Sequence, residues 1–319
     1  MNSQEKREEK RQLLLKRTAE TLGTSLQDAE RLFGIKRLSS FRINRLKAKD
    51  KDTLLSVLNK LGWKGDQSAF YKDGYSIYEG RQQLVDSEAA KDGMIFIQNQ
   101  ASWLPVLALD PQPGETILDM AAAPGGKASH IAELTGNRAD LYVNDNSRTR
   151  LYKLRANFER LGTVYSRQTM YGIERIGKAL PADSFAKILL DAPCSGEGLM
   201  NLGMDKDFTY WSVAQIKRLQ HFQKKAILSA WNLLRPGGIL VYSTCTMAPE
   251  ENEAVVDYLL RRREDAAVLD LPYVFNNRVH AVADWKGKTF NPEIKRCLRL
   301  TPSPLLEAFF VAKLVKNKQ

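Results

Sequence analysis

Residues 116–130 read "TILDMAAAPGGKASH". Apolar and β-branched residues at the start favour a strand, the Ala-, Pro- and Gly-rich centre favours a loop, and the end favours a helix. The same alternation continues along the chain, with strand segments at 140–145, 164–170, 186–193 and 238–245 and long helical segments at 148–162 and 213–234. Such alternation predicts an α/β fold: a mainly parallel sheet covered by helices on both faces, with ligands bound beyond the carboxyl ends of the strands.

A smaller α+β module precedes this pattern. Helices are predicted over 4–22 and from the Ser25 cap to Gly34, a strand over 41–46, a helix over 52–62 and a hairpin around Asp73-Gly74. The pattern changes near Gly93, so we predict an N-terminal module over 1–92 and a catalytic domain over 93–319. Two C-terminal segments, 297–302 and 307–315, are expected to close the sheet as an antiparallel pair.

Composition favours a polyanionic partner. The 319 residues carry a formal net charge of +11 and a pI near 9.4. The stretch "IKRLSSFRINRLKAKDK" concentrates cations, which either line a nucleic-acid face or lie on a solvated surface. The residues from this stretch that we expect to bind RNA are Lys36, Arg37, Arg42, Arg45 and Lys47.

Cysteine usage and hydropathy indicate the compartment. Three widely spaced cysteines suggest neither a disulfide framework nor a metal centre. No apolar run reaches the roughly 18 residues of a membrane helix, and the N-terminus "MNSQEKREEKR" has no signal-peptide core. We therefore expect a cytoplasmic protein with reduced thiols, no membrane association and no metal, acting as a monomer.

The loop after the first strand indicates which cofactor binds. A P-loop would need Gly at 121 and Ser or Thr at 128, but both positions are Ala, and G-x-G-x-x-G is absent as well. The remaining flexible loop lets the backbone approach a ligand that need not carry phosphate. Asp145, at the tip of the next strand, could accept hydrogen bonds from both hydroxyls of a ribose or could cap the following helix. Together these features favour S-adenosylmethionine over NAD or ATP.

Five motifs occur in order: "DMAAAPGGKASH", "VNDNSRTRLYKLRANFERLG", "DAPCSGEG", "RPGGILVYSTCTMAPEENE" and "EAFFVAKL". With them the sequence resembles the RNA cytosine-5 methyltransferases of the Nop/Sun (Sun/Fmu) type over roughly residues 90–315. The resemblance implies a Rossmann-like methyltransferase core, S-adenosylmethionine as cofactor, and 5-methylcytosine formation in tRNA or rRNA.

The resemblance also implies site residues. Cys245 in "STCT" would be the nucleophile, and Cys194 in "APCS" would assist product release. Lys127 could orient Asp191 or the cofactor carboxylate, and Asp191 would contact the reacting base or the cofactor. The residues expected to contact the cofactor are Ala121, Ala122, Ala123, Pro124, Gly125, Gly126, Lys127, Asp145, Arg150 and Asp191.

Three points stay open at this level. The acidic residue that the family usually places near the adenine is missing from its place between Met170 and Glu174. Glu250, Glu251 and Glu253 are interpreted as first-turn acids that complement a helix dipole. The alternatives to an RNA enzyme are a DNA cytosine-5 methyltransferase that uses Cys194, and a non-catalytic RNA-binding assembly factor on the same fold.

Overall fold

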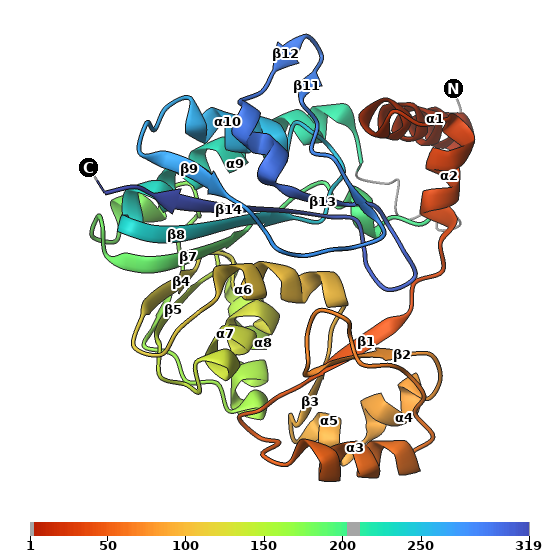
Figure 1. The fold of residues 1–319 in the computed structure, drawn as a ribbon, viewed down its shortest axis with the longest axis vertical. Coiled ribbons are helices and arrows are strands. Elements are labelled where there is room, and N and C mark those ends of the chain that lie inside the picture. Colours follow the sequence, from red (N-terminus) through yellow and green to blue (C-terminus); the bar gives the residue numbers. More distant parts are fainter. Residues whose placement is uncertain (1–2, 203–210, 319) are drawn as a thin grey trace.

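The computed structural model describes residues 3–202 and 211–318 of the chain (Figure 1). The N-terminal third contains α1 (Ser3–Leu22), α2 (Leu26–Gly34), β1 (Ser39–Ile43), α3 (Lys51–Lys60), β2 (Gly74–Ile77), α4 (Arg81–Asp86), α5 (Glu88–Lys91) and β3 (Ile95–Ile97). The three predicted helices are present as α1, α2 and α3, whereas the short helices α4 and α5 were not predicted. The expected hairpin around Asp73-Gly74 is reduced to two isolated antiparallel bridges, because β2 pairs instead with β1.

The N-terminal third packs in two different ways. Strands β2-β1-β3 form an antiparallel sheet with its own apolar core. Helices α1 and α2 instead pack on the larger domain, where Leu14, Leu15 and Phe33 contact Trp211 and Met247. Strand β3 ends at residue 97, so the small sheet extends past the boundary that the sequence places at residue 92. That boundary stays a prediction.

The larger domain follows the predicted strand–helix alternation. Its first half contains η1 (Gln100–Trp103), α6 (Leu104–Leu109), β4 (Thr116–Asp119), α7 (Gly126–Leu134), β5 (Asp140–Asn144), α8 (Arg148–Leu161), β6 (Arg167–Thr169), η2 (Ile176–Lys178) and β7 (Phe185–Asp191). Its second half contains η3 (Glu197–Leu199), α9 (Val213–Leu233), β8 (Leu234–Thr244), α10 (Glu253–Leu260), β9 (Ala266–Leu269), β10 (Arg278–Val279), β11 (Asp284–Trp285), β12 (Lys288–Thr289), η5 (Pro292–Arg296), β13 (Leu298–Leu300) and β14 (Phe309–Lys316).

The central sheet has the order β10-β13-β14-β8-β7-β4-β5-β6, with β9 paired to β14. Strands β8, β7, β4, β5 and β6 are mutually parallel, which is the Rossmann-like core that the alternation predicted. The predicted antiparallel pair of β13 and β14 closes one side through β14, which is antiparallel to β8.

Helices cover both faces of this sheet (Figure 1). Leu118 and Ile188 pack on the side of α9 and α10, whereas their neighbours Ile117 and Leu189 pack on the side of α6, α7 and α8. Successive side chains of a strand point to opposite faces, so strands covered on both sides read as continuous apolar runs. None of the helices in the described part of the chain is long and apolar enough to cross a membrane.

Candidate active site

Both cysteine motifs emerge at the same edge of the sheet. Strands β7 and β8 are parallel neighbours, and Asp191 lies opposite Ser243 in their register. Cys194 lies three residues after Asp191, and Cys245 lies two residues after Ser243. The loops that carry the two cysteines therefore leave the sheet side by side. The two sulfur atoms lie 3.2 Å apart, and both side chains are half-buried.

The two cysteine loops are fixed to each other. The Gly198 N–H donates to the Cys245 carbonyl at 2.9 Å, and the Ser195 and Thr246 hydroxyls lie 2.8 Å apart. A Cβ atom at position 198 would lie 2.4 Å from the Ala308 carbonyl oxygen, so only glycine allows this close approach. The spacing of the two sulfurs is therefore set by backbone contacts as well as by the strands.

The Cys194 thiol stays protonated near neutral pH. The hydrogen bond with Cys245 raises the pKa of Cys194 well above its usual value, and burial and the charge of Glu251 add to the shift. The Cys194 S–H can therefore donate to the Cys245 sulfur, 3.2 Å away.

Lys127 and Asp191 form an ion pair beside the cysteines. Lys127 Nζ lies 2.7 Å from Asp191 Oδ2, while Asp191 Oδ1 accepts a 2.6 Å hydrogen bond from the Ser243 hydroxyl. Burial lowers the pKa of Lys127, but the charges of Asp191, Asp119 and Cys245 outweigh it and leave the pKa above its usual value. Lys127 thus stays cationic beside Asp191, and the role of orienting this carboxylate stays a prediction that the ion pair is consistent with.

The loop from Ala121 to Gly126 lies between the tips of β4 and β5. Ala122 N–H donates to the Asn144 carbonyl at 2.8 Å, and Gly125 adopts a φ of 109°, which favours glycine. Helix α7 starts at Gly126, so its first-turn N–H groups point out of the helix without intrahelical partners. Such a terminus suits the carboxylate of an amino-acid-like ligand.

Asp145 fits a ribose-binding role. It is buried at the end of β5, and its Oδ1 accepts the Ser147 N–H at 3.0 Å. Its Oδ2 lies 3.0 Å from Arg150 Nη1 but accepts no hydrogen bond from the described residues. Arg150 also donates to the Ala123 carbonyl and so ties the loop to this strand tip. A buried carboxylate oxygen without a donor is what two ribose hydroxyls would satisfy, so these residues fit S-adenosylmethionine.

Sequence analysis missed four buried polar residues at this edge. Asp119 ends β4, and burial raises its pKa to about 7 while its Oδ2 has no hydrogen-bond partner among the described residues. Asn144 holds the strand tips together through the Met120 and Tyr171 carbonyls, both at 2.9 Å. The sequence offered the same signal for Asp119 and Asn144: each is a carboxylate or amide that ends a buried strand.

The other two are Glu197 and Glu251, which support the cysteine loops. Glu251 Oε2 accepts the Ser195 N–H at 3.0 Å, and burial raises the pKa of Glu251 to about 7. Glu197 accepts from Thr246 at 3.1 Å. The dipole interpretation is wrong for Glu251, and Glu253 forms a buried ion pair with Arg299 at 2.6 Å. The run of acidic residues after a proline could not predict these contacts, because their partners lie far away in the chain.

The predicted RNA-binding cations do not form one surface. Arg42 is 0% exposed, and its guanidinium pairs with Glu133 and with the Ser129 hydroxyl at 2.7 Å, so it joins the module to α7 and cannot contact RNA. The charge count was misleading there because both faces of β1 are covered: Phe41 and Ile43 pack in the core of the module, and Arg42, on the opposite face, meets α7. Lys36 and Lys47 are exposed, but they lie before and after β1.

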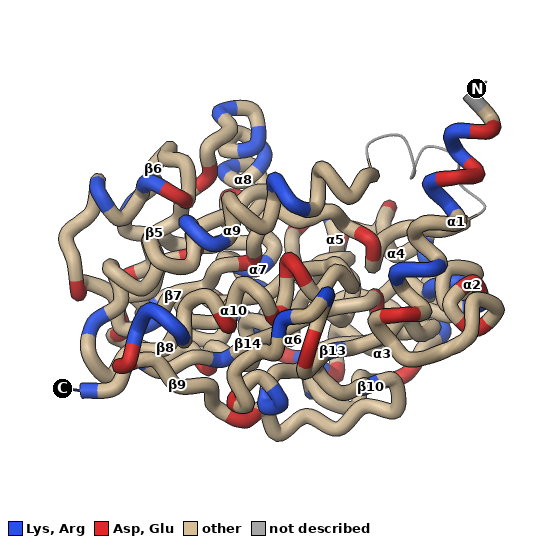
Figure 2. Tube along the Cα trace, turned by 90° about the horizontal axis from the view of Figure 1, so that it is seen from above, with Lys and Arg blue, Asp and Glu red and all other residues tan. Residues whose placement is uncertain are grey.

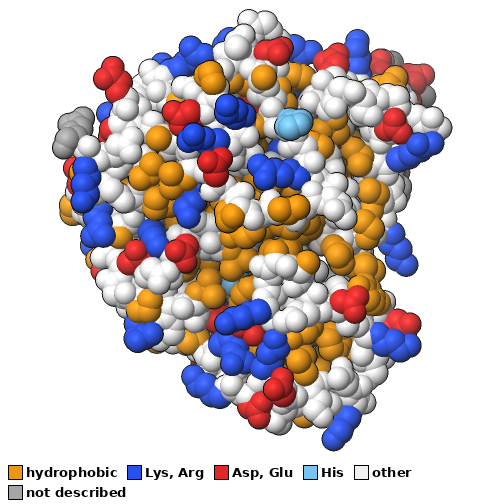
Figure 3. All heavy atoms as spheres, viewed as in Figure 1, with side chains coloured by type: hydrophobic (Ala, Val, Ile, Leu, Met, Phe, Trp, Pro, Cys, Tyr) orange, Lys and Arg blue, Asp and Glu red, His pale blue; other side chains and the backbone are white. Residues whose placement is uncertain are grey.

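Figure 3 likewise shows basic side chains spread over the whole visible face, and Figure 2 shows acids and bases alternating along α1. Arg37 and Arg45 are half-buried, and Arg37 donates to the Met200 carbonyl at 2.7 Å. Net charge alone therefore does not locate an RNA path.

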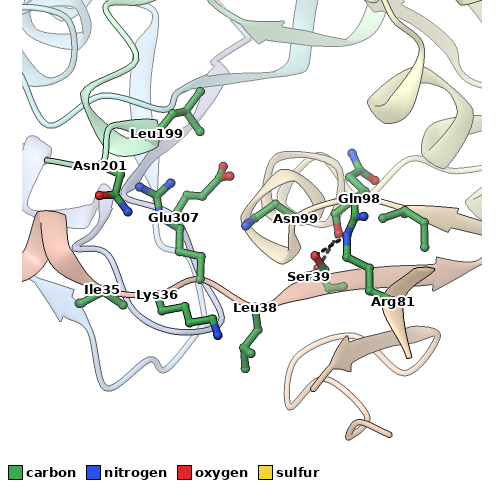
Figure 4. Close-up of a pocket in the computed structure, with 13 residues that line it drawn as sticks. Ile35, Lys36, Leu38, Ser39, Arg81, Gln98, Asn99, Leu199, Asn201 and Glu307 are labelled. Carbon is green, nitrogen blue, oxygen red and sulfur yellow. Dashed lines mark hydrogen bonds between the residues drawn. The ribbon is translucent and has the colours of Figure 1, made fainter. Parts of the chain in front are cut away.

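A pocket of about 550 Å³ opens between the module and the larger domain (Figure 4). Lys36 and Arg81 line it from the module, where Arg81 donates to the Ser39 hydroxyl at 2.9 Å; Glu307 lines it from the loop before β14. Burial raises the pKa of Glu307, and Arg37, Lys127 and Asp191 all act on its charge. The pocket therefore lies next to the Lys127–Asp191 pair.

The loop after β6 contains the residues among which the sequence offered no clear acidic contact for the adenine. The Glu174 carboxylate folds back toward Gly172, and its Oε2 is buried without a hydrogen-bond partner among the described residues. Met170 and Tyr171 are exposed at the strand tip. Within residues 3–202 and 211–318, no three side chains of the metal-ligating types converge on one point.

Comparison with known proteins places this geometry among methyltransferases. Residues 106–315 match the family model described as 16S rRNA methyltransferase RsmB/F. The chain is 36% identical to the tRNA (cytosine(49)-C(5))-methyltransferase of Pyrococcus abyssi, covering 88% of each protein. It is 37% identical to the ribosomal RNA small subunit methyltransferase F of Klebsiella pneumoniae, but spans only 57% of that protein's length. A solved methyltransferase homologue from Pyrococcus horikoshii superposes with a TM-score of 0.78 at 33% identity, covering 95% of this chain and 98% of that one.

Proposed function

The chain belongs to the RsmB/F family of rRNA methyltransferases and is an S-adenosylmethionine-dependent RNA (cytosine-C5) methyltransferase, and we propose that Cys245 is its nucleophile and tRNA or rRNA its substrate. The observation that supports this assignment is the 3.2 Å contact between the two sulfurs, in which the raised pKa of Cys194 keeps that thiol protonated. A protonated thiol is a poor nucleophile, so we assign the attack to Cys245.

The reaction needs a nucleophile because carbon 5 of cytosine is poorly reactive. The Cys245 thiolate adds to carbon 6, and the electron pair of the C5–C6 double bond then makes carbon 5 enamine-like. S-adenosylmethionine, when bound, supplies the methyl group as a sulfonium electrophile. The Asp191 carboxylate, oriented by Lys127 and Ser243, accepts a hydrogen bond from the N4 amino group and fixes the base.

Product release reverses the addition. A solvent water takes the carbon 5 proton, the electron pair of that C–H bond forms the C5–C6 double bond again, and the bond from carbon 6 to sulfur breaks, returning its electron pair to Cys245. The Cys194 S–H, 3.2 Å away, donates to the sulfur that leaves and stabilises its charge. Cys194 thus favours the free thiolate over the covalent adduct.

The binding regions follow from the same geometry. The loop from Ala121 to Gly126 and the Asp145 carboxylate hold the cofactor, and Met170 and Tyr171 cover its adenine in place of the usual acidic contact. RNA enters by the pocket between the N-terminal module and the larger domain, where Lys36 lies. In this proposal residues 1–92 bind RNA, residues 93–319 catalyse, and one chain suffices.

The test uses tRNA and rRNA transcribed with 5-fluorocytidine, which has no carbon 5 proton to lose and so holds the adduct. The wild-type protein should give a covalent complex that survives denaturing electrophoresis and requires S-adenosylmethionine, and Cys245→Ser should give none. Cys297→Ala is the matched control, because this cysteine is buried in the core. An adduct that persists in Cys245→Ser and disappears in Cys194→Ser would reverse the assignment. Bisulfite sequencing of RNA from a deletion strain would then identify the modified cytosine.

A further inference from the structure

A second, larger pocket lies where α9, α10, the β11–β12 hairpin and α1 meet, at the top of Figure 1. Its volume is about 1030 Å³. Seven cations line it, against two carboxylates: Arg17, Lys217, Lys224, Arg261, Arg262, Lys286 and Lys288 face Glu250 and Asp257. Of these residues only Glu250 lies in the loop that carries Cys245, and none lies in the cofactor loop from Ala121 to Gly126.

Three of the seven cations are neutralised locally. Arg17 pairs with Glu250 at 2.8 Å, Arg261 with Asp257 at 2.7 Å, and Lys286 with Glu20 at 2.7 Å. Within the described part of the chain, the remaining four (Lys217, Lys224, Arg262 and Lys288) form no ion pair. The pocket thus holds an excess of positive charge that the protein itself does not balance.

The unpaired cations are close enough to repel one another. Burial lowers the pKa of Lys224, and the charges of Lys288 and Arg262 lower it further. Tyr258 holds two of them in place, with Arg262 over its ring at 3.8 Å and Lys224 at 5.3 Å. Cations crowded in a partly desolvated hollow are stabilised when an anion binds between them.

The pocket adjoins the back of the catalytic loop. Glu250, which faces the pocket, lies five residues after Cys245, and the next residue, Glu251, accepts the Ser195 N–H on the cysteine side. An RNA that reaches the cysteines from the outside of this loop therefore passes close to the pocket. The volume of about 1030 Å³ lies at the upper end of small-ligand sites, so the pocket has room for more than one phosphate group of a chain.

We propose that this pocket binds the phosphates of the RNA substrate outside the target nucleotide, through Lys217, Lys224, Arg262 and Lys288. The inference rests on the proposed function, since it takes RNA as the substrate. Recognition is by backbone charge and not by base stacking, because Tyr258 is covered by cations and Trp285 and Phe290 are buried. The pocket therefore adds affinity without sequence preference.

The experiment measures binding of a fluorescent 30-nucleotide RNA that contains no cytosine, from 50 to 200 mM KCl. The pocket variant Lys217→Gln/Lys224→Gln is compared with Arg218→Gln/Lys225→Gln, which removes two charges from the same helix at exposed residues that do not line the pocket. The pocket variant should bind at least about tenfold more weakly at 50 mM, with a slope of log K against log salt shallower by about 1.4, or 0.7 for each phosphate contact. The control should lie near the wild type.

Equal losses in the two variants, or no loss in either, would overturn the proposal. RNA affinity that is unchanged while inorganic tripolyphosphate stabilises only the wild-type protein against heat would assign the pocket to a free polyphosphate instead. Because this RNA has no cytosine, the result does not depend on methyl transfer. A missing adduct at Cys245 with an intact pocket effect would reject the catalytic assignment alone.

Discussion

Replacing Cys194 by Ala should trap the enzyme on its RNA. The change removes the S–H donor 3.2 Å from Cys245 Sγ and leaves the strands, the loops and the Lys127–Asp191 pair in place. The free thiolate then loses a hydrogen bond, whereas the thioether of the covalent adduct, which carries no charge, loses almost nothing. Elimination becomes less favourable and the adduct accumulates.

The magnitude follows from the charge on the acceptor. A hydrogen bond to a charged group contributes about 1.5 to 3 kcal/mol, which corresponds to a shift of roughly 10- to 160-fold toward the adduct. Loss of a positioned proton donor or acceptor also lowers turnover by about 10²- to 10⁴-fold. The half-buried sulfur packs loosely enough that the free energy of unfolding should change by only about 1 kcal/mol.

The assay is denaturing electrophoresis of enzyme with unmodified RNA and S-adenosylmethionine. Cys194→Ala should give an RNA-shifted band that the wild type does not accumulate, and Cys194→Ala/Cys245→Ala should give none, since elimination can be blocked only after addition. A variant that turns over at the wild-type rate without a shifted band would refute the release role. A band from Cys245→Ala would reverse the two roles and support the alternative in which Cys194 attacks.

Three further predictions concern the surrounding residues. Asp145→Asn should weaken S-adenosylmethionine binding by about 1 to 3 kcal/mol in calorimetry, because it keeps the Oδ1 acceptor for Ser147 but loses the charged Oδ2, which pairs with Arg150 and accepts no hydrogen bond from the described residues; an unchanged dissociation constant would reduce Asp145 to a turn-capping residue. Because burial raises the pKa of Glu251 from 4.5 to about 7, the folded state binds a proton there that the unfolded state releases, so this contribution to stability is fully present below pH 4.5 and is lost as pH rises to about 7. The wild-type free energy of unfolding should therefore fall by about 3 kcal/mol relative to Glu251→Gln between pH 4.5 and 8, and parallel pH curves would contradict this. Arg42→Met should cost about 3 to 5 kcal/mol in denaturant unfolding by leaving Glu133 buried and unpaired, and Arg42→Met/Glu133→Gln should recover much of the loss; a cost below about 1 kcal/mol would mean that water reaches this pair.

Local sequence was sufficient to predict most of the helices and strands, and to predict that ligands bind at the carboxyl ends of the strands. Strand β7 could be predicted because its residues are apolar on both faces, and the start of α7 because two glycines follow an apolar strand. Parallel strands put their carboxyl ends at one edge, so Cys194 and Cys245 could be expected near each other before any coordinates were known. Each of these features depends on residues a few positions apart.

The tertiary structure alone determined the burial, pKa and ion pairing of side chains, because these properties depend on residues far apart in the chain. Sequence does not tell that the pKa of Cys194 is raised, because that shift follows from the 3.2 Å contact with Cys245, from burial and from the nearby charge of Glu251. It also gives Arg42 the same charge as its exposed neighbour Lys36, although packing against Glu133, 91 residues away, makes Arg42 part of the core. Periodicity and residue type report the local backbone, whereas burial, pKa and ion pairing are set by whatever the fold brings alongside each side chain.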